Sequence, residues 1–270
     1  MQLKGKTVLI TGGTAGIGLE AAKQFLANGA KVIITGRDQS KLDAAKRLYP
    51  AVTAIKSDAA NAKDAQALFE QVKALGGIDI LHNNAGVMSG PLNLGAANDR
   101  HFEAAEYEMN VNYLGVIRLN NLFMEMLRSR KEAAIINTSS LLSYVPLLLA
   151  PTYSASKAAV RFYTESLREH LRLLGSNVKV FELLPPLVAT EMAEGLDQKA
   201  ITPEELVKAL IDGLKKDKLT IRVGMTKPLY ILSRLFPSVT FKLVNPTKSG
   251  KQLQPELNPI PLQQGAYHHG

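Results

Sequence analysis

The stretch Thr11-Gly12-Gly13-Thr14-Ala15-Gly16-Ile17-Gly18 follows the apolar run 6–10 and precedes a helical pattern over residues 19–27. A strand, a glycine turn and a helix in this order are typical of a nucleotide site. Glycine lets the backbone approach a pyrophosphate without interference from a Cβ atom, and the free N–H groups at a helix start attract negative charge. The spacing Gly-x-x-x-Gly-x-Gly is looser than the commoner dinucleotide fingerprint, so a glycine turn without a ligand is the alternative.

A second predicted strand, residues 31–35, ends in Gly36-Arg37-Asp38. A dinucleotide without a 2′-phosphate usually meets a carboxylate at this strand end. This chain has Gly36 there and then Arg37, whose guanidinium suits a phosphate better than a diol. The sequence therefore favours NADP as the cofactor. In the alternative, the cofactor is NAD and Asp38 reaches its ribose, or Asp38 simply caps the helix that follows.

The alternation of strands and helices continues along the chain. Alternating strands and helices predict an α/β fold, a single doubly wound parallel sheet with helices on both faces. Such sheets bind ligands at the carboxyl ends of their strands, where Asp58 and Asn84 are expected. The predicted strands cover residues 52–56, 78–82, 133–136, 178–184 and 219–223, and the predicted helices cover 61–75, 101–130, 203–216 and a segment that begins near Pro151.

The long predicted helix 101–130 carries Asn112 and Gly115. Glycine is unfavourable by about 1 kcal/mol relative to alanine in a helix interior, so we expect a packing or functional reason for Gly115. Asn112 could open a kink whose freed carbonyl holds a water molecule.

The stretch from Asn137 to Val160 carries Ser140, Tyr153 and Lys157. Tyr153 and Lys157 are four residues apart on a predicted helix, so they share one face. A nearby ammonium favours the phenolate and lowers the pKa of a phenol from about 10 toward neutral pH. Ser140 could hold a substrate oxygen within reach of that phenol. In the alternative, the Tyr and Lys spacing arises by chance, with the Tyr packed and the Lys solvated.

Composition bounds the class of protein. A chain of 270 residues with 46% hydrophobic residues can bury one good core, and no linker interrupts it before the last twenty residues. We expect one domain over residues 1–250 and a poorly ordered tail over 251–270. The absence of cysteine excludes disulfides and thiol catalysis, and the histidines share no metal-ligand spacing, so no metal is predicted. With no leader and no long apolar run, a cytoplasmic protein is expected.

The formal net charge of +8 is concentrated in one segment. Residues 208–251 contain ten Lys or Arg against two Asp, while the remainder is nearly neutral. This distribution argues against nucleic-acid binding across the fold and indicates a basic face near the C-terminus, unless the segment is merely solvated. The apolar run 229–244, broken by Pro237, predicts an extra helix pair that covers the substrate mouth; an interfacial membrane anchor is the less favoured reading.

Together these motifs resemble the short-chain dehydrogenase/reductase family over residues 5–225, in the family's order and spacing. The motifs are residues 11–18, Asn83-Asn84-Ala85-Gly86, Asn112 with Gly115, Ser140, and Tyr153-x-x-x-Lys157. The resemblance implies a Rossmann-type fold, a homodimer or homotetramer, and NAD(P)-dependent chemistry on secondary alcohols or ketones. By motif match it gives the catalytic positions to Asn112, Ser140, Tyr153 and Lys157.

The resemblance also indicates which residues bind the cofactor. Asp58 resembles the adenine contact, and Thr14 and Ile17 resemble phosphate contacts. The full predicted set is Gly12, Thr14, Gly16, Ile17, Gly18, Arg37, Asp58, Asn84, Ala85, Gly86, Tyr153, Lys157, Pro185, Val188 and Thr190.

One segment departs from the family pattern. After the predicted strand 178–184 the family usually has Pro-Gly, whereas this chain has Pro185-Pro186. Proline has no N–H and a fixed φ, so residue 186 cannot do what glycine could, whereas Thr190 and the N–H of Val188 stay available for the cofactor. The Pro-Pro form and the segment 222–237 resemble the DltE-like oxidoreductase branch. Residues 191–202 are expected to form a mobile substrate lid.

The main functional hypothesis is hydride transfer between a nicotinamide cofactor and a carbonyl carbon. In reduction, Tyr153 donates the proton, Ser140 binds the carbonyl oxygen, Lys157 lowers the phenol pKa and binds the ribose, and Asn112 orders a relay water. The substrate is expected to be a hydrophobic ketone or alcohol, because apolar residues flank Ser140: Leu141, Leu142, Tyr144, Val145 and Leu147. The rival hypothesis is a non-catalytic NADPH-binding regulator that docks a partner on the basic C-terminal face; the intact set of four residues disfavours it.

Overall fold

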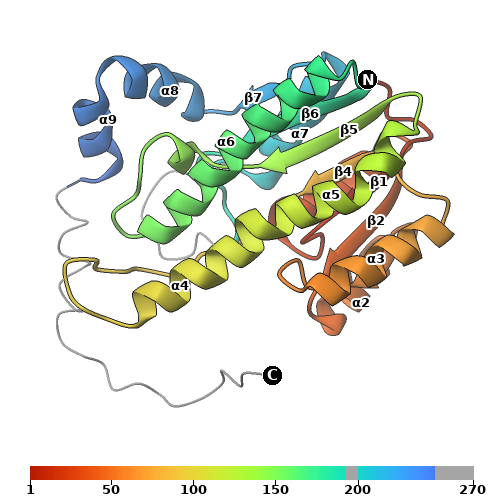
Figure 1. Ribbon diagram of the computed structural model, residues 1–270, viewed down its shortest axis with the longest axis horizontal. Helices are drawn as coiled ribbons and strands as arrows, with labels where there is room; N and C mark the ends of the chain where they lie inside the picture. Colours follow the sequence, from red (N-terminus) through yellow and green to blue (C-terminus); the bar gives the residue numbers. More distant parts are fainter. Residues whose placement is uncertain (192–199, 247–270) are drawn as a thin grey trace.

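The computed structural model of the protein describes residues 1–191 and 200–246. Its centre is one sheet of seven parallel strands in the order β3-β2-β1-β4-β5-β6-β7, as the alternating pattern predicted (Figure 1). The strands are β1 Thr7–Ile10, β2 Lys31–Gly36, β3 Thr53–Lys56, β4 Ile80–Asn83, β5 Ala133–Thr138, β6 Val178–Leu184 and β7 Thr220–Arg222.

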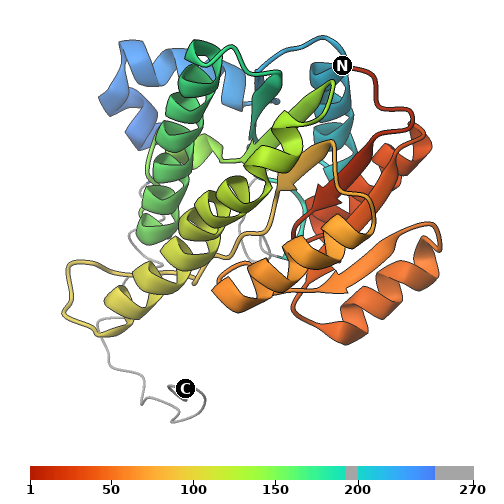
Figure 2. The same ribbon diagram turned by 45° about the vertical axis from the view of Figure 1, so that its right-hand side comes forward.

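Helices cover both faces of the sheet, which confirms the doubly wound class (Figure 2). The helices are α1 Gly16–Ala27, α2 Gln39–Leu48, α3 Ala62–Ala74, α4 Arg100–Met109, α5 Gly115–Arg128, α6 Pro151–Leu173, α7 Pro203–Lys215, α8 Thr226–Leu235 and α9 Pro237–Val244. Buried side chains of α1, α2 and α7, such as Phe25, pack with Val8 and Ile10 on one face. Side chains of α3, α5 and α6, such as Phe123, pack with Leu9 on the other. Strand residues alternate between the two cores because successive side chains point to opposite faces.

The strand order reverses between β1 and β4. From β1 the chain winds outward to β2 and β3, and from β4 it winds the other way to β5, β6 and β7. Ile10 pairs in register with His82, so the carboxyl ends of β1 and β4 lie side by side. Sheets of this class bind ligands in the crevice at such a reversal. The glycine turn that follows β1 therefore opens into the expected ligand crevice.

The long helix predicted over residues 101–130 is present but contains a wide turn. α4 and α5 join through a π-helical turn, Asn110–Leu114, which includes Asn112. A π turn displaces backbone carbonyls from their usual i→i+4 partners, which fits the freed carbonyl expected at this position. The packing reason for Gly115 is also found: a Cβ atom there would lie 2.7 Å from the carbonyl oxygen of Ala59.

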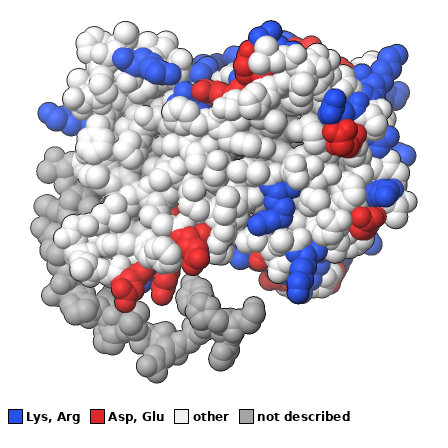
Figure 3. Space-filling view, viewed as in Figure 1, with Lys and Arg blue, Asp and Glu red and all other residues white. Residues whose placement is uncertain are grey.

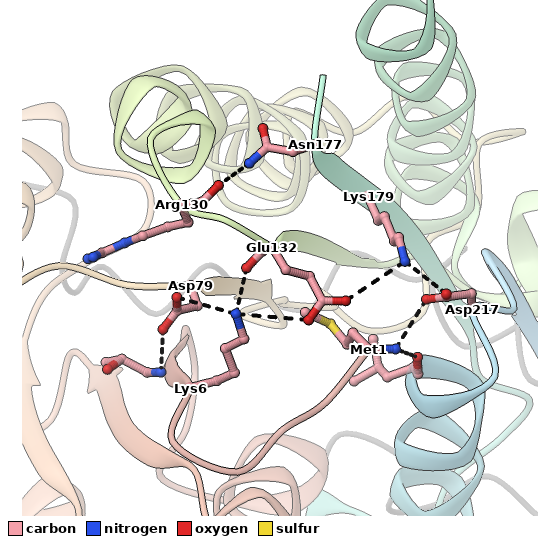
Figure 4. A network of polar contacts seen from close by, with 10 residues as sticks. Met1, Lys6, Asp79, Arg130, Glu132, Asn177, Lys179 and Asp217 are labelled. Carbon is pink, nitrogen blue, oxygen red and sulfur yellow. Dashed lines mark hydrogen bonds and ion pairs between the residues drawn. The ribbon is translucent and has the colours of Figure 1, made fainter. Parts of the chain in front are cut away.

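A network of charges closes the amino end of the sheet (Figure 4). The Lys6 ammonium donates to the carbonyl oxygen of Glu132 at 2.8 Å. Lys179 pairs with Asp217 at 2.8 Å. The N-terminal ammonium of Met1 donates to Asp217 at 3.2 Å and to a carbonyl of α7 at 2.8 Å. These contacts join the starts of β1, β5 and β6 to the end of α7.

The predicted extra helix pair is α8 and α9, which extends beyond β7 at the upper left of Figure 1. Asn245, just after α9, donates to the carbonyl oxygen of Pro146 at 2.9 Å and accepts from the N–H of Leu148 at 2.7 Å. These bonds fix the pair against the loop that precedes α6. Most of the predicted lid and the whole predicted tail lie outside the described residues. Within residues 1–191 and 200–246, no helix has the length and apolarity to cross a membrane.

Candidate active site

The glycine turn after β1 is shaped by close neighbours. Gly12 and Gly16 have φ of 63° and 51°, a left-handed conformation that favours glycine. A Cβ atom at Gly12 would lie 2.9 Å from the Cα atom of Ala85, and one at Gly16 would lie 3.0 Å from a methyl carbon of Thr190. The turn therefore lies between the segments that follow β4 and β6, and three predicted cofactor segments meet there.

The start of α1 suits an anion. Its N-cap residue, Ala15, offers no side-chain hydrogen bond to the first amides, and the first turn contains no acidic residue. Exposed N–H groups and the positive end of a helix together favour a phosphate. The turn and the helix start thus fit the pyrophosphate of a dinucleotide, as the sequence predicted.

Thr11, the first residue of the glycine motif but not one of the predicted cofactor contacts, connects the two strands at the crevice. Its hydroxyl oxygen accepts from the N–H groups of Asn84 and Ala85, each at 3.0 Å. The Asn84 side chain donates to the carbonyl oxygens of Thr11 at 3.1 Å and Gly12 at 3.2 Å. Asn84 therefore holds the glycine turn, and its own contact with a cofactor stays a prediction. The available signal was a polar side chain directly before the first glycine.

Arg37 and Asp38, which follow β2, have different contacts in the structure. Asp38 caps α2 by accepting from the N–H groups of Ser40 at 2.7 Å and Lys41 at 3.2 Å. A hydrogen bond from the Ser40 side chain, with the backbone bond from Lys41, lowers the pKa of Asp38. Arg37 is exposed and donates to the Tyr107 hydroxyl at 2.6 Å. The capping alternative for Asp38 is found, which leaves Arg37 as the group that can meet a 2′-phosphate. No sequence signal pointed to Tyr107.

Ser140 and Tyr153 come together as predicted. Ser140 follows β5, where its Oγ atom accepts from the N–H of Leu142 at 3.1 Å. Burial raises the pKa of the Tyr153 phenol to about 12, a hydrogen bond with Ser140 lowers it, and the charge of Glu108 raises it. Both hydroxyls can therefore contact the same substrate oxygen.

Lys157 is buried beside Tyr153 on α6. Its ammonium donates to the carbonyl oxygen of Thr138 at 3.0 Å and lies 5.6 Å from the centroid of the Tyr153 ring. Burial lowers the pKa of Lys157 to about 8. The phenol pKa thus shifts opposite to the sequence expectation, because burial of the phenol disfavours its charged form.

Asn112 anchors the loop after β4. Its Oδ1 atom accepts from the N–H of Val87 at 2.8 Å, and its Nδ2 atom donates to the Val87 carbonyl and to Ser156 Oγ, both at 2.9 Å. Gly86 lies between the catalytic groups, since a Cβ atom there would be 3.4 Å from both Asn112 Oδ1 and Lys157 Nζ. Both N–H groups of the Asn112 side chain are thus used, and its ordering of a relay water stays a prediction. Ser156 was missed, although it lies beside Lys157 in the sequence.

Glu108, one helical turn before Asn112, is a buried carboxyl group that the sequence analysis also missed. It is 1% exposed, and its Oε1 atom accepts from the N–H of Ser89 at 2.7 Å. Its Oε2 atom has no hydrogen-bond partner among the described residues. Its charge helps to raise the pKa of Tyr153, and a Glu within a long predicted helix gives no sequence signal of such burial.

The segment after β6 contacts both halves of the site. The carbonyl oxygen of Pro185 accepts from the N–H of Leu141 at 2.8 Å, and Val188 forms a bridge with Ile201. Thr190 lies beside Gly16. Asp58, after β3, accepts from the N–H of Ala60 at 2.9 Å. Direct contacts of these residues with a cofactor stay predictions.

An apolar cluster lies against Tyr153. Leu147, Leu149 and Ala150 are its buried centre, and its partly buried members are Met88, Leu142, Tyr153 and Val244. The sequence also placed Tyr144 at this pocket, but Tyr144 accepts from Arg222 Nε at 3.0 Å and packs on Tyr230 of α8. It therefore faces the helix pair rather than the catalytic phenol.

A family model described as short chain dehydrogenase matches residues 6–201. The chain belongs to the short chain dehydrogenase family. This short chain dehydrogenase is 36% identical over 228 residues to an uncharacterized oxidoreductase, DltE, from Bacillus subtilis, covering 82% of this chain and 89% of that protein. It is 32% identical over 213 residues to a 3alpha-hydroxysteroid dehydrogenase from Mediterraneibacter gnavus, covering 75% of this chain and 82% of that one.

A solved short chain dehydrogenase from Burkholderia cenocepacia, in complex with NADP, has a similar structure. Its TM-score is 0.80 at 28% identity, and the match covers 90% of this chain and 99% of that chain. The predicted family, its Rossmann fold and the likeness to DltE are thereby confirmed, and the protein is an oxidoreductase of this family.

Proposed function

We propose that the protein transfers a hydride between NADP(H) and a carbonyl or secondary alcohol of a hydrophobic substrate. The observation that carries this proposal is the meeting of Ser140, Tyr153 and Lys157 beside an apolar cluster, at the carboxyl edge of the sheet. A partly buried Tyr and a buried Lys with shifted pKa values in such a place are typical of catalysis.

The cofactor proposal rests on the fit of the site. The left-handed turn at Gly12 and Gly16 and the uncapped start of α1 suit a pyrophosphate, and Arg37 suits a 2′-phosphate. The Burkholderia relative binds NADP, which supports the same choice. When bound, the cofactor supplies or accepts the hydride.

The side chains of this protein then handle the substrate oxygen and its proton. Since the pKa of Tyr153 is about 12, the phenol is fully protonated at neutral pH and can donate in the reduction direction. Ser140 holds the same oxygen by a hydrogen bond. Lys157, with a pKa of about 8, is charged at neutral pH and stabilises the phenolate that proton donation leaves. Asn112 fixes the loop after β4 that closes the site.

The substrate proposal rests on the cluster of Leu142, Leu147, Leu149 and Met88 around Tyr153. Burial of substrate in such surroundings contributes roughly 25 cal/mol for each Å² of apolar surface. A bulky apolar ketone or alcohol benefits most. The relative named as a 3alpha-hydroxysteroid dehydrogenase supports this class without fixing the compound.

The experiment is a panel of ketones and secondary alcohols of increasing apolar size, followed by NADPH absorbance. We expect turnover that rises with apolar size and is lost in Tyr153→Phe. NADPH binding without turnover of any compound would instead support the regulator hypothesis. Light scattering on the same sample tests the proposed homodimer or homotetramer.

A further inference from the structure

The helix pair α8 and α9 leaves many large apolar side chains in solvent. Their exposed fractions range from 36% to 65%. Isolated exposed apolar residues are common, but a contiguous set over two short helices indicates an interaction surface. The residues are Met225, Ile231, Leu235, Phe236, Val239, Phe241 and Leu243.

The charges on this pair have one sign. The sequence from Thr226 to Asn245 contains Lys227, Arg234 and Lys242 and no acidic residue. Figure 3 shows this surface, at its upper left, in white and blue without red. A partner for this face must therefore accept apolar side chains and positive charge together.

The two kinds of side chain share the exposed faces of both helices. In α8, Lys227, Ile231, Arg234 and Leu235 are exposed at spacings that place them on one helical face. In α9, Val239, Lys242 and Leu243 are likewise exposed and lie on one helical face within about one turn. Apolar side chains flanked by basic ones are the pattern of helices that lie in a membrane interface.

The pair also adjoins the substrate side of the active site. A groove of about 390 Å³ separates residues 144–146 from α8 and α9. Val244, the last residue of α9, packs in the apolar cluster that contains Tyr153. Whatever surface the helix pair contacts thus lies close to the proposed substrate pocket.

A second copy of the chain is the weaker candidate for this surface. A two-fold contact through α8 and α9 would bring Lys227, Arg234 and Lys242 of both copies together with no carboxylate from the same helices. An anionic lipid surface complements these charges and also accepts the apolar side chains, which sink to the acyl boundary.

We propose that α8 and α9 dock the protein on the surface of an anionic phospholipid bilayer. The helices lie in the interface, with their basic side chains at the headgroups. Docking would bring the pocket beside Tyr153 close to substrates dissolved in the bilayer. This supply of substrate rests on the proposed function, whereas bilayer binding does not.

The test is co-sedimentation of the full chain with vesicles of phosphatidylcholine alone or with about 30% phosphatidylglycerol. We expect binding to the anionic vesicles, weakened by salt, and little binding to the neutral ones. Replacing Lys227, Arg234 and Lys242 by Gln should lower the partition coefficient about 100-fold, because each basic residue near such a surface contributes about fivefold. Ile231→Glu with Leu235→Glu should abolish binding.

A matched control uses α2, which also exposes basic and apolar side chains. Lys46, Arg47 and Leu48 are exposed, Leu48 by 61%. The variant Lys46→Gln, Arg47→Gln, Leu48→Glu should bind vesicles like the wild type. Equal NADPH affinity in all variants shows that each one folds.

Two outcomes would overturn the proposal. The first is a wild type that does not bind anionic vesicles; a change of mass in the Ile231 and Leu235 variant would then make the face an interface between copies. The second is an equal loss of binding in the α2 control, which would indicate adhesion by net charge alone. Turnover of a water-soluble ketone is measured in parallel and should be unchanged in the helix-pair variants. If the wild type does not turn over the ketone, the proposed function fails, and the result for bilayer binding still stands.

Discussion

The two ends of the sheet hold their charged groups in opposite ways: the network at the amino end is partly exposed, whereas Lys157 at the carboxyl end is buried. At the amino end, Lys6, Lys179 and the Met1 ammonium meet carboxylates and carbonyls in one connected network (Figure 4). At the carboxyl end, Lys157 is buried against a backbone carbonyl, and Ser140 is close enough to Tyr153 to affect its pKa. Ions are thus paired at the amino end, whereas at the carboxyl end no carboxylate of residues 1–191 and 200–246 forms a hydrogen bond with the Lys157 ammonium.

The pKa values record this difference. At the amino end, hydrogen bonds from Lys179 and the N-terminus help to lower the pKa of Asp217, so pairing stabilises its charge. At the carboxyl end, burial lowers the pKa of Lys157 to about 8 and raises that of Tyr153 to about 12. Burial without a countercharge disfavours the charged form of either group. The contrast predicts that substitutions at the carboxyl end change chemistry and those at the amino end change stability.

The largest effect is expected for Tyr153→Phe. The ring and its packing survive while the proton donor is lost, and a general acid contributes roughly 10²- to 10⁴-fold to the rate. We expect a loss of kcat in that range, with the Kd for NADPH within about twofold of the wild type. Retained turnover would remove Tyr153 from the catalytic role.

A smaller effect is expected at Arg37, which should select NADPH over NADH. A charge-assisted contact of about 1.5 to 3 kcal/mol corresponds to roughly ten- to 150-fold discrimination. Arg37→Leu should remove this discrimination, as measured by the dissociation constants for NADPH and NADH at one moderate salt concentration. The single exchange is cleaner than one that includes Gly36, because a Cβ atom there would lie 2.8 Å from a methyl carbon of Thr14.

Tyr107→Phe is the matched control for Arg37. It removes the hydroxyl that Arg37 contacts and leaves the guanidinium in place. We expect the preference for NADPH to change by about fivefold or less, because an exposed contact of a charged group contributes at most about 1 kcal/mol. Equal affinity for the two cofactors in the wild type would show that Arg37 does not contact the 2′-phosphate.

A pH effect of similar or smaller size should follow from Lys157. Because burial lowers its pKa to about 8, the ammonium is present below that pH and lost above it. The affinity for NADPH should therefore fall as pH rises through about 8. Titrations of NADPH binding from neutral to alkaline pH should show this fall in affinity in the wild type and no fall in Lys157→Met, which lacks the titrating group. An equal fall in both proteins would show that another group causes the pH dependence.

The smallest effect is expected at the amino end. Lys6→Met removes the bond to Glu132 and the pairing with Asp79 while keeping an apolar stem. We expect a loss of about 1 kcal/mol in the free energy of unfolding, from urea titration, with kcat unchanged. The exposed neighbour Lys4→Met should change neither quantity. A large fall in kcat for Lys6→Met would show that the two ends of the sheet are coupled.

Local patterns of the sequence were sufficient for the elements and for part of the site. The strand, glycine turn and helix around Gly12, the strands that alternate with helices, and the four-residue spacing of Tyr153 and Lys157 are all set within a few residues of chain. Hydrophobic period and backbone preference act over that range, so the sheet and the meeting of Ser140 with Tyr153 were predictable. The helix pair near the C-terminus followed in the same way from its apolar run and Pro237.

Contacts between distant segments were decided only by the tertiary structure. Thr11 with Asn84, Asn112 with Ser156, and Arg37 with Tyr107 join residues 44 to 73 positions apart. No local preference specifies such pairs, because they depend on where the strand order reverses and on which helix covers which face. The direction of the Tyr153 pKa shift also belongs here. Spacing shows that an ammonium is near the phenol, but burial by helices and loops from across the chain decides which protonation state is favoured.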